Sequence, residues 1–339
     1  MGRLRYLAIV LTLAVMALVG SLVHVVALAE ETVPAYNAAP VHNNITPAYN
    51  NDAIPNVSSP NTACTSDDSY PTQRWGVSKI EAPQAWQIAE GNEPILVAVL
   101  DTGIDEDNQD LADKLVAQVN FTDSSTSNDL YGHGTHMAGT IVAIAPECQL
   151  MNVKVADDLG RCEASVVAKG IAWAADHGAE VINISLCVKS SPDLEEAVNY
   201  AWSEGALIVA AAGNEGDSTP VYPAYYTNCL AVAATNESDS LALLSGYGDW
   251  VDVAAPGFKI YSELPDNQYG YKSGTSSAAA QVSGVAALAF GVAEDGNDNG
   301  AVNDEVRQAI ENSCSPINVG GVGKGLVNAL GAVTELISN

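Results

Sequence analysis

The sequence predicts an α/β fold in which helices cover both faces of a mainly parallel sheet. Short, continuous apolar runs, typical of buried parallel strands, alternate along the chain with longer segments of helical length. Strands and helices that alternate in this way are joined by right-handed crossovers, which place helices on both faces of the sheet. The chain has 339 residues, of which 47% are hydrophobic, enough for a large core.

The predicted elements follow one another from about residue 73, where a short helix near Pro83 opens the folded region. Each strand is an apolar run that ends at a polar residue or a turn, and these runs are 95–100, 149–155, 181–186, 207–212, 230–234 and 251–254. The helices have apolar or small residues at helical spacing, and they are 134–144, 165–177, 193–204, 282–290 and 304–310. Gly178 and Gly205 each end a helix.

The N-terminal region is typical of an exported protein. Residues 1–29 combine basic residues, a long apolar run and an Ala-x-Ala pattern, and we interpret them as a secretory signal peptide. Because the apolar run is long, an uncleaved membrane anchor with the folded domain outside is the alternative. Residues 30–72, rich in Pro, Asn, Ala, Ser and Thr, are expected to be a disordered linker or short pro-segment. Residues 73–339 form the folded domain.

Charge and cysteine content limit the function further. A formal net charge of -28 with only 13 Lys and Arg argues against nucleic-acid binding, which depends on clustered positive charge. Export makes the six cysteines candidates for disulfides, although some could be free, buried side chains. Six cysteines allow 15 pairings, and the sequence does not choose among Cys64, Cys148, Cys162, Cys187, Cys229 and Cys314.

Three polar residues stand where an α/β fold builds its sites. Asp101 ends an apolar strand, at the carboxyl edge of the sheet. His133 lies between two glycines at a helix start, and Ser276 lies in a small-residue stretch that leads into a buried helix. Each of these residues, taken alone, could be a common turn or surface residue without a catalytic role. Together they give the chain order Asp, His, Ser of a nucleophilic triad, in which His takes the hydroxyl proton and Asp orients His.

A fourth residue completes this chemistry. Asn214 follows a buried strand, within Ala-Ala-Gly-Asn-Glu-Gly, and its amide can stabilise the oxyanion of a tetrahedral intermediate. The alternative is a simple turn residue. For His24, His136 and His177 we favour structural or surface positions.

Residues from about 75 to 336 resemble the subtilisin-like serine peptidases, and most of all the thermitase branch. The similarity is carried by Leu-Asp-Thr-Gly-Ile-Asp, His-Gly-Thr-His-Met-Ala-Gly-Thr, Ala-Ala-Gly-Asn-Glu-Gly and Ser-Gly-Thr-Ser. It implies a three-layer subtilisin-like fold with a seven-stranded sheet, and endopeptidase activity with Asp101, His133 and Ser276 as triad and Asn214 as oxyanion donor. It also implies that catalysis needs no cofactor and that the partners are protein or peptide substrates. We expect a monomer.

The resemblance places the substrate pocket at residues that are apolar or neutral: Ser185, Leu186, Cys187, Ala211, Ala212 and Gly213. We therefore expect a preference for uncharged, apolar residues on the acyl side of the cleaved bond. Cys187 stands where the family has glycine, and Cys162 falls on the opposite substrate strand. Ala280 stands where the family has proline, which could shift Ser276. Peptide ligation, or a binding protein that keeps the fold, are the alternative functions.

A candidate calcium site lies further along the chain. The short segment after Thr140 leaves no room for the family's strong calcium loop, so that site is expected to be absent. Between two predicted helices, Asp295, Asn297 and Asn299 fill alternate positions of a calcium-loop pattern, and Ala301 could add its carbonyl. Because the twelfth position is apolar, the alternative is an acidic turn in which Asn303 caps the next helix.

Overall fold

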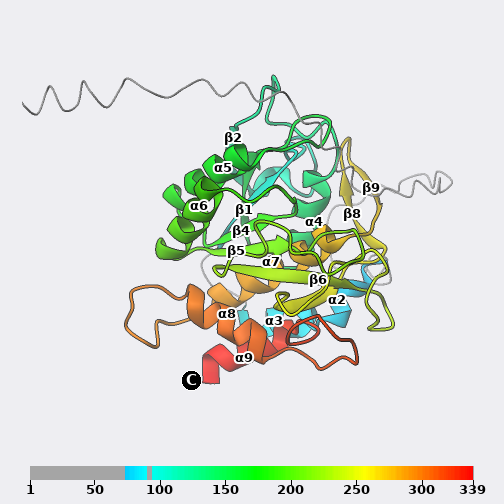
Figure 1. Cartoon of the computed structure of the whole chain (residues 1–339), viewed down its shortest axis with the longest axis vertical. Coiled ribbons are helices and arrows are strands. Elements are labelled where there is room, and N and C mark those ends of the chain that lie inside the picture. The colour runs from blue at the N-terminus through cyan, green and yellow to red at the C-terminus, as the bar shows by residue number, and fades with distance from the viewer. Residues whose placement is uncertain (1–72, 90–93, 339) are drawn as a thin grey trace, which may run out of the picture. The chain divides into compact units, whose positions relative to one another are not determined.

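The computed structural model describes residues 73–89 and 94–338, and the signal-peptide and linker predictions lie outside these residues. Seven strands form one sheet in the order β2-β3-β1-β4-β5-β6-β7, and all its pairings are parallel, which confirms the predicted fold class (Figure 1). The strands are β1 Leu96–Asp101, β2 Leu115–Asn120, β3 Gln149–Lys154, β4 Val181–Ile184, β5 Leu207–Ala211, β6 Cys229–Thr235 and β7 Val253–Pro256.

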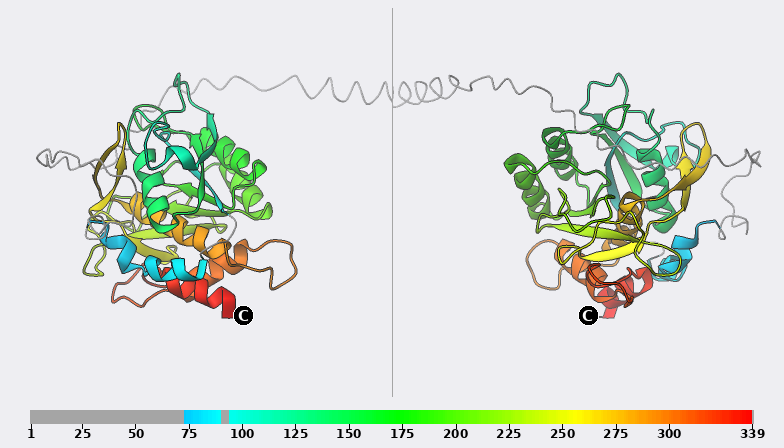
Figure 2. Two further views of the ribbon diagram at one scale, coloured as in Figure 1. Left: turned by 180° about the vertical axis from the view of Figure 1, so that it is seen from behind. Right: turned by 45° about the vertical axis from the view of Figure 1, so that its right-hand side comes forward.

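Helices cover both faces of this sheet (Figure 2). Successive side chains of a strand point to opposite faces, and β1 shows the result: Val97 and Val99 enter one core, Ala98 and Leu100 the other. The first core is closed by α3 Ala82–Ala89, α4 Gly134–Ile144, α7 Thr275–Phe290, α8 Asn303–Asn312 and α9 Ala329–Ser338. The second is closed by α5 Ala164–Asp176 and α6 Pro192–Ser203.

Helix α7 runs through the first core, and all of its 16 residues are buried. Its Ala, Ser and Gly side chains are small, so neighbouring strands and helices approach its backbone closely. The helix begins at Thr275, seven residues before the predicted start at residue 282. The prediction was wrong there because the Ser- and Ala-rich first turns lack the apolar spacing of an amphipathic helix.

Several elements of the described chain were not predicted, among them β2, an antiparallel hairpin and α9. Strand β2 lies at the sheet edge and is only half-buried, so its sequence lacks a continuous apolar run. The antiparallel hairpin of β8 Ile260–Leu264 and β9 Gln268–Lys272 packs beside α4. Helix α9 packs against α3 and α8. None of the described helices has the length and hydropathy needed to span a membrane.

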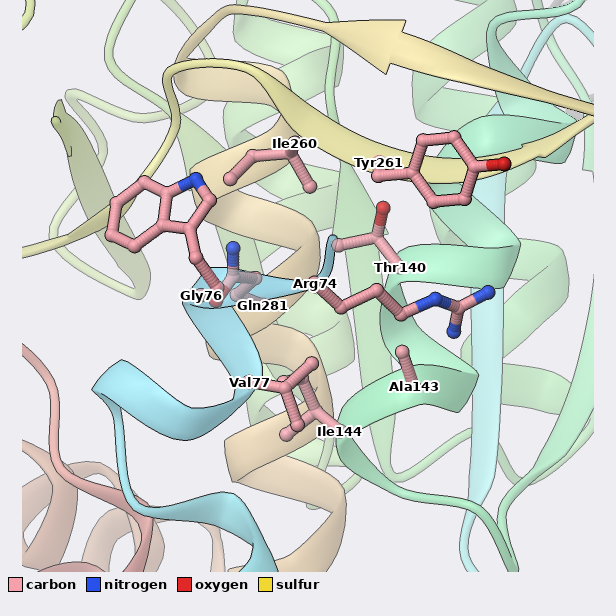
Figure 3. A pocket seen from close by; sticks show the side chains of 10 residues that line it. Arg74, Gly76, Val77, Thr140, Ala143, Ile144, Ile260, Tyr261 and Gln281 are labelled. Carbon is pink, nitrogen blue, oxygen red and sulfur yellow. The ribbon is translucent and has the colours of Figure 1, made fainter. Parts of the chain in front are cut away.

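The N-terminal part of the folded domain is fastened by a buried ion pair. Arg74 directly precedes α2 Trp75–Lys79, and its Nη2 lies 2.5 Å from Oε1 of Glu263 in β8. The Glu263 side chain is 3% exposed, and its Oε2 accepts a hydrogen bond from Ser262 Oγ at 2.8 Å. Figure 3 shows Arg74 lining the same pocket as Thr140 of α4 and Tyr261 of β8. The pair therefore joins chain segments that are 189 residues apart.

Candidate active site

Asp101 and His133 form the best-defined pair of polar side chains at the carboxyl edge of the sheet. Asp101 ends β1, and His133 is the residue before α4. His133 Nδ1 lies 2.7 Å from Asp101 Oδ1 and 2.9 Å from Oδ2, and both residues are buried. A carboxylate at this distance requires Nδ1 to carry the ring proton, which leaves Nε2 as an acceptor.

Asp129 organises the segment that carries His133. Its carboxylate is buried and accepts hydrogen bonds from the backbone N–H of Gly132 at 2.7 Å and of Thr135 at 2.9 Å. It also accepts from Thr102 Oγ1 at 2.9 Å, next to Asp101. Sequence reasoning missed Asp129, because a single Asp in a polar loop gives no signal of the long-range contacts that bury it.

Ser276 is the second residue of α7 and is 9% exposed. Its Oγ donates a hydrogen bond to the carbonyl of Ser185 at 3.0 Å, and Ser185 Oγ donates to the carbonyl of Ser276 at 3.0 Å. Ser185 directly follows β4, the neighbour of β1, so Ser276 lies at the same sheet edge as Asp101. In this structure its hydroxyl hydrogen bonds to Ser185.

Asn214 lies in the loop after β5 and is oriented by the residue before Ser276. Its Oδ1 accepts hydrogen bonds from the backbone N–H of Thr275 at 2.8 Å and from Thr275 Oγ1 at 3.1 Å. These two bonds fix the plane of the amide and leave Nδ2 available as a donor beside the start of α7. The positive end of the helix dipole at that point also favours a negative charge.

The predicted substrate-binding residues are brought together. Residues 185–187 follow β4, Ala211 ends β5 and residues 212–213 follow it, and these two strands pair in parallel. Cys187 Sγ lies 4.0 Å from the carbonyl oxygen of Ala211, so the thiol spans the two stretches. Burial raises the pKa of Cys187 to about 12, and also that of Cys162, so both thiols stay protonated.

The five cysteines of the described chain are free thiols: Cys148, Cys162, Cys187, Cys229 and Cys314. The structure therefore shows none of the predicted disulfides among these five, and Cys64 lies outside the described residues. Cys148 is buried in the first core and Cys229 in the second, as expected of thiols that act as small apolar side chains.

The other described histidines have structural positions, as favoured. His136 is buried, and its Nε2 lies 3.1 Å from the carbonyl oxygen of Ile260 in the hairpin. Burial lowers the pKa of His136 well below its ordinary value, so its ring stays neutral. His177 is exposed and stacks on Trp173, with ring centroids 4.0 Å apart.

The altered stretch after Ser276 remains helical. Ala280 lies inside α7, and Gln281 Nε2 donates a hydrogen bond to the carbonyl of Pro256 at 2.9 Å. Gln281 Oε1 is buried, finds no hydrogen-bond partner among the residues that the structure describes, and lines a cavity of about 10 Å³, shown in Figure 3. A cavity of this size holds about one water molecule.

The loop before α8 holds its polar groups by internal hydrogen bonds. Asp295 accepts from the backbone N–H of Asn299 and of Gly300, and Asn297 Nδ2 donates to Asp304 at 2.8 Å. Within residues 73–89 and 94–338, no group of three or more His, Cys, Asp or Glu side chains is arranged to hold a metal ion. Ala301 belongs to the same loop, where its backbone N–H donates to Asn299 Oδ1 at 2.8 Å.

The capping alternative for Asn303 was wrong. Asn303 is the first residue of α8, and the residue before it makes no side-chain cap. The Asn303 side chain is buried and donates to the carbonyl of Trp202 at 3.0 Å instead, which ties α8 to the end of α6.

Comparison with known proteins shows the family of the chain. A model described as the subtilase family matches residues 92–332. Thermitase from Thermoactinomyces vulgaris is 43% identical over 281 residues, which cover 79% of this chain and 98% of thermitase. A thermophilic serine proteinase from Bacillus sp. (strain AK1) is 40% identical over 308 residues, covering 85% of this chain and 75% of that protein. Subtilisin BL from Lederbergia lenta is 40% identical over 266 residues, which cover 75% of this chain and 96% of subtilisin BL.

A solved structure agrees. A structure of proteases from Pseudoalteromonas arctica PAMC 21717 superposes with a TM-score of 0.70 and 27% sequence identity, covering 78% of this chain and 97% of that chain. The resemblance to the thermitase branch is thus confirmed by identity along nearly the whole folded region. The chain belongs to the subtilase family of serine endopeptidases.

Proposed function

We propose that this chain hydrolyses peptide bonds with Asp101, His133 and Ser276 as its catalytic triad. The observation that carries the proposal is the pair of contacts from His133 Nδ1 to the Asp101 carboxylate, at 2.7 and 2.9 Å. These contacts select the tautomer whose Nε2 can take a proton. Ser276, at the start of α7 on the same sheet edge, supplies the hydroxyl.

The reaction proceeds in two halves. The Ser276 hydroxyl turns about χ1 from Ser185 towards His133 Nε2, which takes its proton as Oγ attacks the peptide carbonyl. The Asn214 amide and the Ser276 backbone N–H stabilise the resulting oxyanion. Imidazolium returns the proton to the leaving amine, and an acyl-enzyme remains. A water molecule, deprotonated by His133, then attacks the acyl carbonyl, and the acid leaves as Ser276 regains its proton.

The proposed substrates are proteins or peptides with an uncharged, apolar residue on the acyl side of the cleaved bond. The side chains of the stretches 185–187 and 211–213 carry no charge, which supports this preference. We further propose that the enzyme is exported and acts as a monomer. Catalysis requires no cofactor. Structural calcium at the loop of Asp295 stays a separate prediction.

The direct test is covalent labelling with a fluorophosphonate, which phosphonylates an activated serine. We expect labelling of Ser276 in the full chain, and loss of both label and casein hydrolysis in Ser276→Ala. The matched control is Ser277→Ala, which removes the adjacent buried hydroxyl and should keep label and activity. Full hydrolysis by Ser276→Ala would refute the assignment of Ser276 as the nucleophile. Absence of both label and hydrolysis in the wild-type protein would refute the proposed activity and favour a non-catalytic binding protein.

A further inference from the structure

Strand β4 carries an amide side chain in the middle of an apolar, fully buried run. Asn183 lies between Ile182 and Ile184, and all three residues are buried. Side chains of a strand point alternately to the two faces of the sheet, and Val181 packs in the first core, so Asn183 faces helix α7. Burying an amide costs free energy unless hydrogen bonds replace its contacts with water.

The amide of Asn183 joins two serines. Its Oδ1 accepts a hydrogen bond at 3.0 Å from Oγ of Ser283, in the middle of α7, and its Nδ2 donates to Oγ of Ser185 at 3.1 Å. Ser185 Oγ in turn donates to the carbonyl of Ser276 at 3.0 Å. These four residues form one continuous chain of hydrogen bonds that ends on Ser276, and none of them is more than 9% exposed.

Every donor in this chain points the same way, towards Ser276. A hydroxyl has a single proton, so Ser185, which donates to the carbonyl of Ser276, accepts from Asn183. The amide of Asn183 then presents Oδ1 to the hydroxyl of Ser283. Hydrogen bonds that run head to tail polarise one another, and a buried environment strengthens each of them. The last bond, on the Ser276 carbonyl, is therefore supported by the two bonds before it.

Two hydrogen bonds between Ser185 and Ser276 fix different parts of the nucleophile. The bond to the Ser276 carbonyl fixes the backbone of the first turn of α7, and the bond from the Ser276 hydroxyl to the Ser185 carbonyl fixes the resting side chain. An error of about 1 Å in the position of a reacting group can lower a rate by about 100-fold. The position of Ser185 therefore affects the rate of attack by Ser276.

We propose that Asn183 and Ser283 are positioning residues for the nucleophile, which act on Ser276 through Ser185. Both side chains are fully buried, so neither touches a bound peptide. The proposal rests on the proposed function, because it takes Ser276 as the attacking residue. It adds an internal support that runs from the middle of α7 through β4 and back to the first turn of the same helix.

The test compares Asn183→Ala and Ser283→Ala with the full-length wild-type chain. Two rates are measured: kcat for a peptide nitroanilide, and the rate constant of fluorophosphonate labelling at Ser276, which reports the reactivity of the hydroxyl without a bound peptide. We expect Asn183→Ala to lower both rates about 10- to 100-fold with little change in KM. Ser283→Ala removes only the first bond of the chain, so both rates should fall about 3- to 10-fold.

The double variant distinguishes one connected chain from two separate structural contacts. If Ser283 acts only through Asn183, the double variant should be no slower than Asn183→Ala alone. The acid limb of the pH profile of kcat/KM should not move in any of these variants, because the Asp101–His133 pair lies outside the chain. Losses that multiply in the double variant, or a shifted acid limb, contradict the inference.

Asn152 provides the matched control. It is also fully buried, and it pairs with Val99 of β1 from one side as Asn183 does from the other. Its Nδ2 donates to the carbonyl of Ser127 instead, at 3.0 Å. Asn152→Ala should therefore lower the melting temperature but keep kcat and the labelling rate within about threefold of wild type.

The outcomes separate the inference from the proposed function. Wild-type rates in Asn183→Ala and Ser283→Ala, with melting temperatures lowered as in Asn152→Ala, overturn the inference and leave the proposed function intact. If Asn183→Ala does not fold, Ser283→Ala gives the answer: slower labelling supports the inference, and an unchanged labelling rate overturns it. A wild-type chain that neither hydrolyses peptides nor takes the label refutes the proposed function, and the inference with it.

Discussion

Asn214 offers the sharpest test of transition-state stabilisation in this site. Asn214→Ala removes the Nδ2 donor whose orientation is fixed by the two hydrogen bonds from Thr275 to Oδ1. Because this donor is already aligned, its removal should raise the energy of the transition state and leave the energy of the bound substrate almost unchanged. One such donor is worth about 3–4 kcal/mol, so kcat should fall by about 10²–10³ with little change in KM.

Two further variants show which atom matters. Asn214→Asp keeps the Oδ1 acceptor for Thr275 but replaces the donor by an anionic oxygen, so it should be less active than Asn214→Ala. Thr275→Val keeps the backbone N–H at 2.8 Å and removes only the hydroxyl, so kcat should fall by no more than about tenfold, about 1.4 kcal/mol.

The assay is steady-state hydrolysis of a peptide nitroanilide, with kcat and KM measured separately and melting temperatures as a check of folding. A kcat of Asn214→Ala within about threefold of wild type would refute the oxyanion role, since that is far less than one lost donor costs. An increase in KM with unchanged kcat would make Asn214 a residue for ground-state binding.

Three other perturbations test separate features. Burial raises the pKa of Glu180, whose Oε2 accepts from Leu96 N–H at 2.7 Å, so folding favours its protonated form and stability is lost as pH rises above the ordinary value of 4.5. Glu180→Gln should therefore raise the melting temperature at neutral pH but not below pH 4.5, and an equal shift at both would contradict this. Cys187→Gly opens the contact with Ala211 and should broaden cleavage towards larger acyl-side residues; an unchanged peptide-library profile would count against it. If calcium binds the loop of Asp295, excess calcium should raise the melting temperature and Asp295→Ala should abolish the rise; equal melting temperatures in calcium and chelator would exclude a stabilising site.

The parts of the fold that the sequence predicts are those with a strong local pattern. The run before Asp101 is continuous and apolar, because β1 is buried on both faces, and its predicted bounds differ by one residue from those observed. The hairpin β8–β9 escaped prediction because its strands mix Tyr with polar residues and are stabilised by contacts with α4, far away in the chain. The first turns of helix α7 were likewise not predicted, because they are stabilised by burial in the core and not by a local apolar pattern.

The same distinction holds within the candidate site. The motifs around Asp101, His133, Asn214 and Ser276 identified candidate residues, and the structure places them at one sheet edge. The hydrogen bond from Ser276 to Ser185 and the hydrogen bonds of the buried Asp129 carboxylate could not be predicted from the sequence. Each is a contact between segments whose approach is decided by the whole fold.

The ion pair of Arg74 and Glu263 sets an energetic limit to how far the N-terminus can be trimmed. Cleavage that stops before Arg74 leaves the pair intact. Loss of one residue more leaves a carboxylate that is 3% exposed without its cation, and breaking such a buried pair costs about 3–5 kcal/mol. Arg74, the first residue that the folded domain cannot lose, is therefore determined by Glu263 in β8, which lies 189 residues further along the chain. Any maturation of this chain by proteolysis should yield a mature N-terminus at or before residue 74.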